Sequence, residues 1–367
     1  MRKKRIGLVL AGLLILLTAC GKKESENLLT TEAQQTEAER TESEQDEVES
    51  VESEQVDMQI VNSSLTVWPT YWDTVTVLKE MEAMQDKIDT VCYFAAYFDD
   101  KQQPFIPEET LQTLAAAKAQ FASKNWKSYL TFVNDRLLSG GGSSLKDTSL
   151  LYDLLQQPVQ RKKHIDQILN MTAENGFDGI EIDYEGIKKD TELWNILNIF
   201  LNELTAEAAN RKISVRILLE PSAPVDSISF PAGPEYVLMC YNLYGYGTAP
   251  GPKANKEFLI QMSQLLEKVP EPRNMALSLG GFDFAADGSV SQLTEVECVS
   301  LLQATGAAVN RDSGSKDLVF SYIDSKSMKH EVWYADNETL QYWMRIGNSC
   351  GIDRFSIWRL GSNVTLQ

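Results

Sequence analysis

The chain has 367 residues, with 52 acidic against 34 basic side chains and a formal net charge of −18. This excess of negative charge argues against a nucleic acid or another anionic polymer as a partner held by charge alone, and it suits a neutral substrate. The length is ample for one large α/β domain.

The N-terminal segment is basic over residues 1–5 and apolar over residues 6–17, and a cysteine, Cys20, follows shortly afterwards. This pattern is typical of a secretory signal, and the apolar run is shorter than the roughly 20 residues of a membrane-spanning helix. The cysteine at the expected cleavage site resembles the bacterial lipoprotein box. That resemblance implies a signal over 1–20, a lipid on Cys20 and an anchor on the extracytoplasmic face of the cell membrane. An ordinary signal peptide with a chance cysteine is the alternative.

Residues 21–57 are rich in Glu, Gln, Ser and Thr, with 13 acidic and 3 basic side chains. Such a segment has almost nothing to bury, so it is predicted to be a disordered acidic tether that extends by self-repulsion. Residues 58–367 still carry a net charge of −12 once the +4 of the signal and the −10 of the tether are set aside.

Cysteine and histidine usage disfavours a metal site. Four cysteines follow Cys20 in the chain: Cys92, Cys240, Cys298 and Cys350. They have no Cys-x-x-Cys or Cys/His metal spacing and are predicted to be buried free thiols, although an exported protein could also pair them. The only two histidines, His164 and His330, make a His-rich metal site or a Ser-His-Asp triad unpromising, and His164 is expected to be exposed. No metal and no cofactor are expected.

The segment 58–367 alternates strand and helix patterns. Eight strands are predicted, over residues 65–68, 90–96, 128–133, 179–184, 214–219, 236–241, 275–279 and 354–358. Seven helices are predicted between most of them, near residues 74–86, 107–122, 158–174, 190–210, 254–268, 294–308 and 337–349. This alternation means parallel βαβ units, and eight strands predict an α/β fold of the (β/α)8 TIM barrel type. A doubly wound open sheet is the alternative, weakened because no Gly-rich phosphate turn follows the first strand.

The fourth predicted strand carries three acids on one face. Residues 178–185 read Asp-Gly-Ile-Glu-Ile-Asp-Tyr-Glu, so Glu181, Asp183 and Glu185 share one parity and the apolar residues share the other. Three carboxylates on one face resist burial, and a purely structural strand would not choose them. A solvated edge strand is the alternative interpretation.

The depth of these acids in a barrel predicts their chemistry. Active sites lie at the carboxyl ends of barrel strands, so Glu185 is expected at the rim, Asp183 about 6–7 Å deeper and Glu181 deeper again. The deep acids should be desolvated and share protons or hydrogen bonds. The rim acid is free to donate a proton to a substrate, which is the arrangement that general acid catalysis needs.

The same segment resembles the Asp-x-x-Asp-x-Asp-x-Glu signature of glycoside hydrolase family 18, the chitinase-like barrels. Asp178, Asp183 and Glu185 match it, whereas Glu181 stands where the family has Asp. Met-Cys-Tyr-Asn at 239–242 is similar to a second motif of the family.

Two segments near the C-terminus resemble one branch of that family. Ile-Trp-Arg-Leu-Gly at 357–361 and His-Glu-Val-Trp-Tyr-Ala-Asp at 330–336 are similar to the spore-cortex and cell-wall hydrolases. The resemblance covers roughly 62–362, and its motifs occur in the family's order on the predicted strands.

The resemblance implies a retaining, substrate-assisted mechanism. Glu185 would protonate the glycosidic oxygen and later activate water, while Asp183 would orient the 2-acetamido group and stabilise the oxazolinium ion. Tyr241 would hydrogen-bond the acetamide oxygen, Trp358 would form the apolar floor under the sugar, and Asn242 would contact the substrate. Asp178 and Glu181 would support the site. Packing in the core is the alternative role of Tyr241 and of Trp358.

We therefore expect a monomeric surface lipoprotein whose barrel hydrolyses β-1,4 bonds next to N-acetylglucosamine. Peptidoglycan, chitin fragments and N-glycan cores are compatible substrates, and the export signal with the branch resemblance favours peptidoglycan-type glycans. The extra methylene of Glu181 in a packed interior typically costs about 1–3 kcal/mol unless the site adapts, so a non-catalytic glycan-binding lipoprotein on the same fold is the main alternative. An anchored adaptor with no sugar site is a third.

Overall fold

The computed structural model of the protein describes residues 63–366. The predicted signal over 1–20, its lipidation residue Cys20 and the tether over 21–57 lie outside the described residues. None of the helices within 63–366 is long and apolar enough to cross a membrane.

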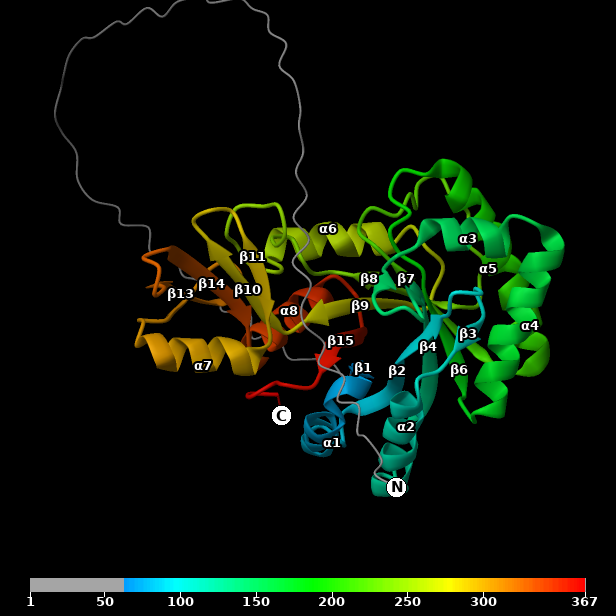
Figure 1. Ribbon diagram of the computed structural model, residues 1–367, viewed down its shortest axis with the longest axis horizontal. Coiled ribbons are helices and arrows are strands. Elements are labelled where there is room, and N and C mark those ends of the chain that lie inside the picture. The colour runs from blue at the N-terminus through cyan, green and yellow to red at the C-terminus, as the bar shows by residue number, and fades with distance from the viewer. Residues whose placement is uncertain (1–62, 367) are drawn as a thin grey trace, which may run out of the picture. The chain divides into compact units, whose positions relative to one another are not determined.

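The core of the fold is a closed barrel of eight parallel strands (Figure 1). The barrel strands are β1 (Ser64–Pro69), β2 (Ile88–Phe98), β4 (Lys127–Leu137), β6 (Gly179–Asp183), β7 (Ser214–Leu219), β8 (Glu235–Met239), β9 (Arg273–Ser278) and β15 (Arg354–Leu360). Each strand pairs in parallel with the next, and β1 pairs with both β2 and β15, which closes the ring. All eight predicted strands are confirmed, and so is the (β/α)8 TIM barrel.

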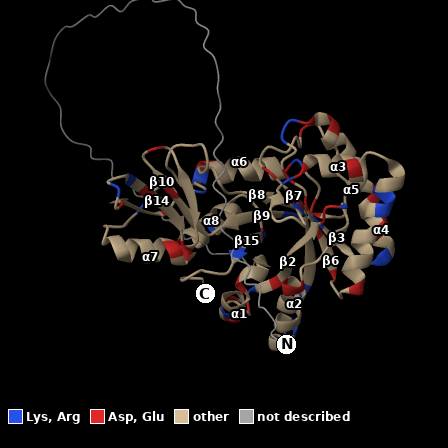
Figure 2. Ribbon diagram, in the orientation of Figure 1, with Lys and Arg blue, Asp and Glu red and all other residues tan. Residues whose placement is uncertain are grey.

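Seven of the helices lie where the sequence pattern predicts them. They are α1 (Thr74–Ala83), α2 (Glu108–Gln120), α4 (Pro158–Glu174), α5 (Thr191–Arg211), α6 (Lys256–Leu266), α7 (Glu295–Thr305) and α8 (Asn337–Ser349). An eighth, α3 (Thr148–Leu155), was not predicted; it begins after Asp147, whose carboxylate accepts hydrogen bonds from the backbone N–H groups of Ser149 and Leu150. Figure 2 shows the basic residues of α4 on the outer side of the barrel.

A second, antiparallel sheet is inserted between β9 and β15. It is built from β10 (Gly280–Ala285), β11 (Val290–Leu293), β12 (Asn310–Arg311), β13 (Leu318–Ile323) and β14 (Lys329–Ala335). Helix α7 covers one face of it, where Cys298 packs with Phe320, Val332 and Tyr334. The expectation that α7 is a helix of the barrel is therefore wrong: α7 belongs to the insertion, and α8 packs on β9.

The burial of β6 follows its alternation. Ile180 and Ile182 point to the core shared with the surrounding helices, while Glu181 and Asp183 point into the barrel and are also buried.

The structure also tests what the sequence predicts for the histidine at position 164 and for the cysteines. His164 is fully buried rather than exposed, and its Nε2 hydrogen-bonds the Tyr184 hydroxyl at 2.7 Å. The four cysteines within the described residues are free, and three of them are buried.

Candidate active site

Glu185 is held at the rim of the barrel by its backbone. It lies two residues beyond Asp183, the last residue of β6, and Asn134 of β4 binds it twice: Oδ1 accepts from the Glu185 N–H at 2.9 Å and Nδ2 donates to its carbonyl at 3.0 Å. The next N–H, of Gly186, donates to Oε2 of Glu220 at 3.0 Å. These three bonds fix the direction in which the Glu185 side chain leaves the strand, as a positioned proton donor requires.

The Glu185 carboxylate has one cationic partner that the sequence did not indicate. Lys146, in the loop after β4, places its Nζ 2.5 Å from Oε2 of Glu185. Burial raises the pKa of Glu185 above its ordinary value, while the Lys146 ammonium opposes that shift. Burial and Lys146 thus shift the pKa of Glu185 in opposite directions.

Asp183 is almost fully buried and lacks a partner. Only 6% of the residue is exposed, and its Oδ1 has no hydrogen-bond partner among the described residues. Burial raises its pKa well above the ordinary value, and the nearby carboxylates of Glu185 and Glu181 add to the shift. A buried carboxyl with a free oxygen is costly for folding, so it marks a place reserved for something other than packing.

Glu181 is bonded through both carboxylate oxygens. Its Oε1 accepts from Trp68 Nε1 at 2.6 Å and from Thr131 Oγ1 at 2.7 Å, and its Oε2 accepts from Arg216 Nε at 2.9 Å. Arg216 also pairs with Glu235. The expected hydrogen bond between the two deep acids is not formed among the described residues, because both carboxylate oxygens of Glu181 are bonded to other side chains.

Tyr241 and Trp358 close the site from other strands. Tyr241 lies two residues beyond the end of β8, at the same carboxyl edge of the barrel as the acids of β6. Burial raises the pKa of Tyr241 well above its ordinary value, and the carboxylates of Glu185 and Asp183 add to the shift. Trp358 packs with Tyr241 against one apolar cluster inside the barrel. Its ring centre lies 4.8 Å from that of Phe94 in an edge-on arrangement. Both aromatic residues thus pack inside the barrel, and Tyr241 is also under the electrostatic influence of the two acids.

The remaining predicted site residues lie apart from this centre. Asn242 follows Tyr241, is exposed and has a left-handed backbone with φ of 61°. Asp178 lies at the amino end of β6, where its Oδ2 accepts from the Ser128 N–H at 2.9 Å. That bond aligns β6 with β4, so Asp178 supports the strand that carries the acids and not the site itself.

The amino-acid sequence matches a known protein family. The sequence profile described as glycosyl hydrolases family 18 matches residues 68–363. The chain belongs to glycosyl hydrolase family 18. Within that family it is similar to proteins of the spore-cortex branch.

Two curated relatives illustrate the branch. The uncharacterized glycosylase YvbX of Bacillus subtilis is 25% identical over 234 residues, covering 59% of this chain and 67% of that protein. The cortical fragment-lytic enzyme of Bacillus cereus is 22% identical over 241 residues, covering 61% of this chain and 55% of the enzyme. The match to the second relative thus spans little more than half of its length.

Solved structures share the family 18 fold. The spore cortex-lytic enzyme SleL of Bacillus cereus has a TM-score of 0.67 at 18% identity, covering 83% of this chain and 72% of that one. A chitinase from Chromobacterium violaceum has a TM-score of 0.67 at 16% identity, covering 82% of this chain and 95% of that one. At these identities the likeness concerns the fold.

The family 18 site contains four polar residues that sequence reasoning did not single out: Asn134, Lys146, Arg216 and Glu220. Arg216 left a signal, because it is a charged residue within the otherwise apolar strand Ser214–Leu219. Asn134 ends the apolar run of β4. Lys146 and Glu220 lie in loops, where periodicity carries no information about side-chain direction.

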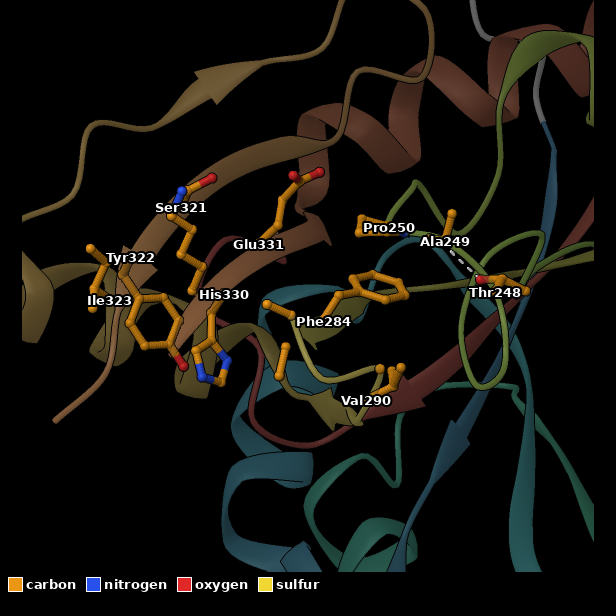
Figure 3. Close-up of a pocket in the computed structure, with 14 residues that line it drawn as sticks. Thr248, Ala249, Pro250, Phe284, Val290, Ser321, Tyr322, Ile323, His330 and Glu331 are labelled. Carbon is orange, nitrogen blue, oxygen red and sulfur yellow. Dashed lines mark hydrogen bonds between the residues drawn. The ribbon is translucent and has the colours of Figure 1, made fainter. Parts of the chain in front are cut away.

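Two cavities lie on the inserted side of the molecule. One, of about 410 Å³, extends from Trp358 and includes Trp72, Arg359 and Thr294. The other, of about 670 Å³, is framed by Phe284, Tyr322 and the loop Thr248–Pro250 (Figure 3). None of the predicted site residues lines the second cavity, whereas the first continues the site from Trp358.

Proposed function

We propose that the protein hydrolyses β-1,4 bonds next to N-acetylglucosamine by a retaining, substrate-assisted mechanism. The observation that carries this proposal is that Glu185, Asp183 and Tyr241 lie at the carboxyl ends of barrel strands, where the acids act electrostatically on the phenol, and that Tyr241 packs on the same apolar cluster as Trp358. Two acids with different surroundings, one held at the rim and one buried, can play different roles in one reaction.

In the first step, protonated Glu185 gives its proton to the glycosidic oxygen. The bond from that oxygen to the anomeric carbon breaks, and the 2-acetamido oxygen of the same sugar forms a bond to that carbon. The resulting oxazolinium ion is cationic, so the buried Asp183 stabilises it most when ionised. Tyr241 donates a hydrogen bond to the acetamide oxygen before that oxygen attacks.

In the second step, Glu185 acts as the base. It takes a proton from a water molecule whose oxygen bonds the anomeric carbon, and the acetamide is restored. Two successive inversions at that carbon give net retention. Trp358 supplies a flat apolar surface of the kind that stacks on a pyranose ring.

The glycan we propose is of the peptidoglycan type. Several relatives are named for lysis of the spore cortex or of its fragments, which supports a bacterial wall glycan over chitin. We further propose that a lipid on Cys20 holds the barrel at the extracytoplasmic membrane surface as a monomer. Recovery in the membrane fraction, with a lipid mass on Cys20, tests the anchor.

A second candidate is glycan binding without cleavage. The ion pair between Glu185 and Lys146 favours it, because a carboxylate that is paired with an ammonium has no proton to donate. The two candidates share the sugar site and differ in turnover.

The test compares residues 58–367 with the Glu185→Gln variant on N-acetylglucosamine oligomers and purified peptidoglycan. Glu185→Gln keeps the volume and removes the proton, so kcat should fall by about 10²–10⁴-fold. Mass spectrometry of the products reveals which bond is cut. Glu207→Gln, in the partly exposed ion pair with Arg211 on the outer helix α5, is the matched control and should keep full activity.

Equal activity in Glu185→Gln would show that Glu185 is not the acid. Measurable oligomer binding without products from the unmodified chain would instead establish the binding candidate.

A further inference from the structure

The contact between Lys146 and Glu185 comes from the solvent side of the site. The Lys146 side chain is 50% exposed, whereas that of Glu185 is 18% exposed, and Nζ meets Oε2 at 2.5 Å. The ammonium therefore caps the carboxylate on the side from which a glycan has to approach. A general acid must be within hydrogen-bond reach of the oxygen that it protonates, and here Lys146 occupies one of its two oxygens.

The backbone of Lys146 is anchored, whereas half of its long side chain is exposed to solvent. Its N–H donates to Oδ1 of Asp135 at 2.7 Å, and the next N–H, of Asp147, donates to the Asn134 carbonyl at 2.9 Å. Just before it, the exposed glycines 140–142 form the tip of the loop. The ammonium can thus leave Glu185 for solvent by rotation of the side chain alone, with no change in the barrel.

The other charges around Glu185 explain why a cation rests there. Glu220, from the end of β7, and Asp135, from β4, both raise the pKa of Glu185 by repulsion, and Asp183 lies beneath it. Lys146 relieves this crowding of carboxylates in the free protein. A bound glycan relieves it differently, because Glu185 then carries a proton shared with the glycosidic oxygen.

We propose that Lys146 is a latch over the acid: in the free protein it covers Glu185, and an entering glycan displaces it. The latch rests on the proposed function of the same site. It adds a regulatory step, since binding has to break an ion pair before the acid meets its substrate. Lys146 is in these terms a positioning residue, because it acts through Glu185.

The latch has two measurable consequences. Lys146→Met removes the ion pair and keeps the apolar stem, so a glycan should bind about two- to fivefold more tightly, as loss of a partly exposed ion pair implies. The limb of the kcat/KM profile that reports Glu185 should move to higher pH, because an ammonium favours the carboxylate and its removal favours the protonated acid. Lys146→Arg keeps the charge and should resemble the unmodified chain.

The experiment is a double-mutant cycle on glycan affinity. Calorimetry measures binding of a thio-linked N-acetylglucosamine oligomer, which resists hydrolysis, to the unmodified domain, Lys146→Met, Glu185→Gln and the double variant. Lys146→Met should tighten binding when Glu185 is present and change nothing in the Glu185→Gln background, where no ion pair exists. Lys124→Met, which breaks the ion pair with Asp86 elsewhere on the barrel, is the control and should bind like the unmodified domain.

Each outcome decides a different question. The latch is supported if Lys146→Met binds the oligomer more tightly than the unmodified domain while the double variant binds it like Glu185→Gln alone. Equal binding in all four proteins, or weaker binding in Lys146→Met, overturns the latch and leaves the proposed function standing. Absence of binding in all four overturns the proposed function and the latch with it.

Discussion

Glu181 and Asp183 lie two residues apart on the same face of β6, yet their surroundings differ completely. Glu181 accepts three hydrogen bonds and pairs with Arg216, whereas Asp183 keeps an oxygen with no partner among the described residues. Both are buried, so burial alone does not distinguish their roles. The deeper acid is thus bonded into the barrel, whereas the upper one keeps an unpaired oxygen, which supports the catalytic role that we propose for it.

The comparison also explains how the barrel accommodates Glu where the family signature has Asp. The longer side chain reaches Arg216 of the neighbouring strand, and the arginine continues the network to Glu235 and Ser356. A buried charge cluster of this kind is tolerated because nearly every donor and acceptor in it is bonded.

The largest expected effect comes from removal of the arginine. Arg216→Met leaves Glu181 and Glu235 as buried carboxylates without their counter-charge, and such a change typically costs about 3–5 kcal/mol. Urea unfolding measures the loss. Arg211→Met is the control, since Arg211 pairs with partly exposed acids and should cost at most about 1 kcal/mol. Equal stability of the two variants would mean that the Glu181 network is not structural.

A smaller effect is expected from Glu181→Asp, which restores the family pattern. The shorter side chain cannot hold its bonds to Trp68, Thr131 and Arg216 at once, so unfolding free energy should fall by about 1–2 kcal/mol. The shape of the pH–rate profile should stay unchanged, because Glu181 does not share a proton with Asp183. Glu207→Asp, in the partly exposed ion pair with Arg211, controls for the shortening itself. A shifted profile would show that the two acids do exchange a proton.

Much of the barrel was predictable because strand and helix periodicities repeat along it. The alternation of residues 178–185 placed three acids on one face, and the structure confirms that two of them point into the barrel. The inserted sheet was missed because its strands are antiparallel and joined by short turns, as at Asp324–Met328, while the pattern over 294–308 was assigned to the barrel.

Other features depended on contacts between distant segments. His164 was expected at the surface from its basic neighbours, but helical phase turns it inward to Tyr184. Lys146 reaches Glu185 across 39 positions of the chain through a loop with no repeating pattern. Sequence periodicity indicates which side of an element is buried, and it does not indicate which loop side chain meets which strand end.

The most direct test of the contrast between the two acids is Asp183→Asn, measured for both activity and stability. Activity should fall by about 10²–10³-fold, because an amide cannot release a proton and become the carboxylate that stabilises the oxazolinium ion.

The free energy of unfolding should rise in Asp183→Asn, whereas activity falls. The raised pKa of Asp183 means that the folded state holds a proton that the unfolded state releases, so this group costs the unmodified chain stability as pH rises above about 4. The advantage of Asp183→Asn should therefore grow by about 1.4 kcal/mol for each pH unit until the folded-state pKa is passed. Loss of activity with this pH-dependent gain in stability is the predicted result. Full activity, or a pH dependence of stability identical to that of the unmodified chain, would contradict the assignment of Asp183 as the acid reserved for catalysis.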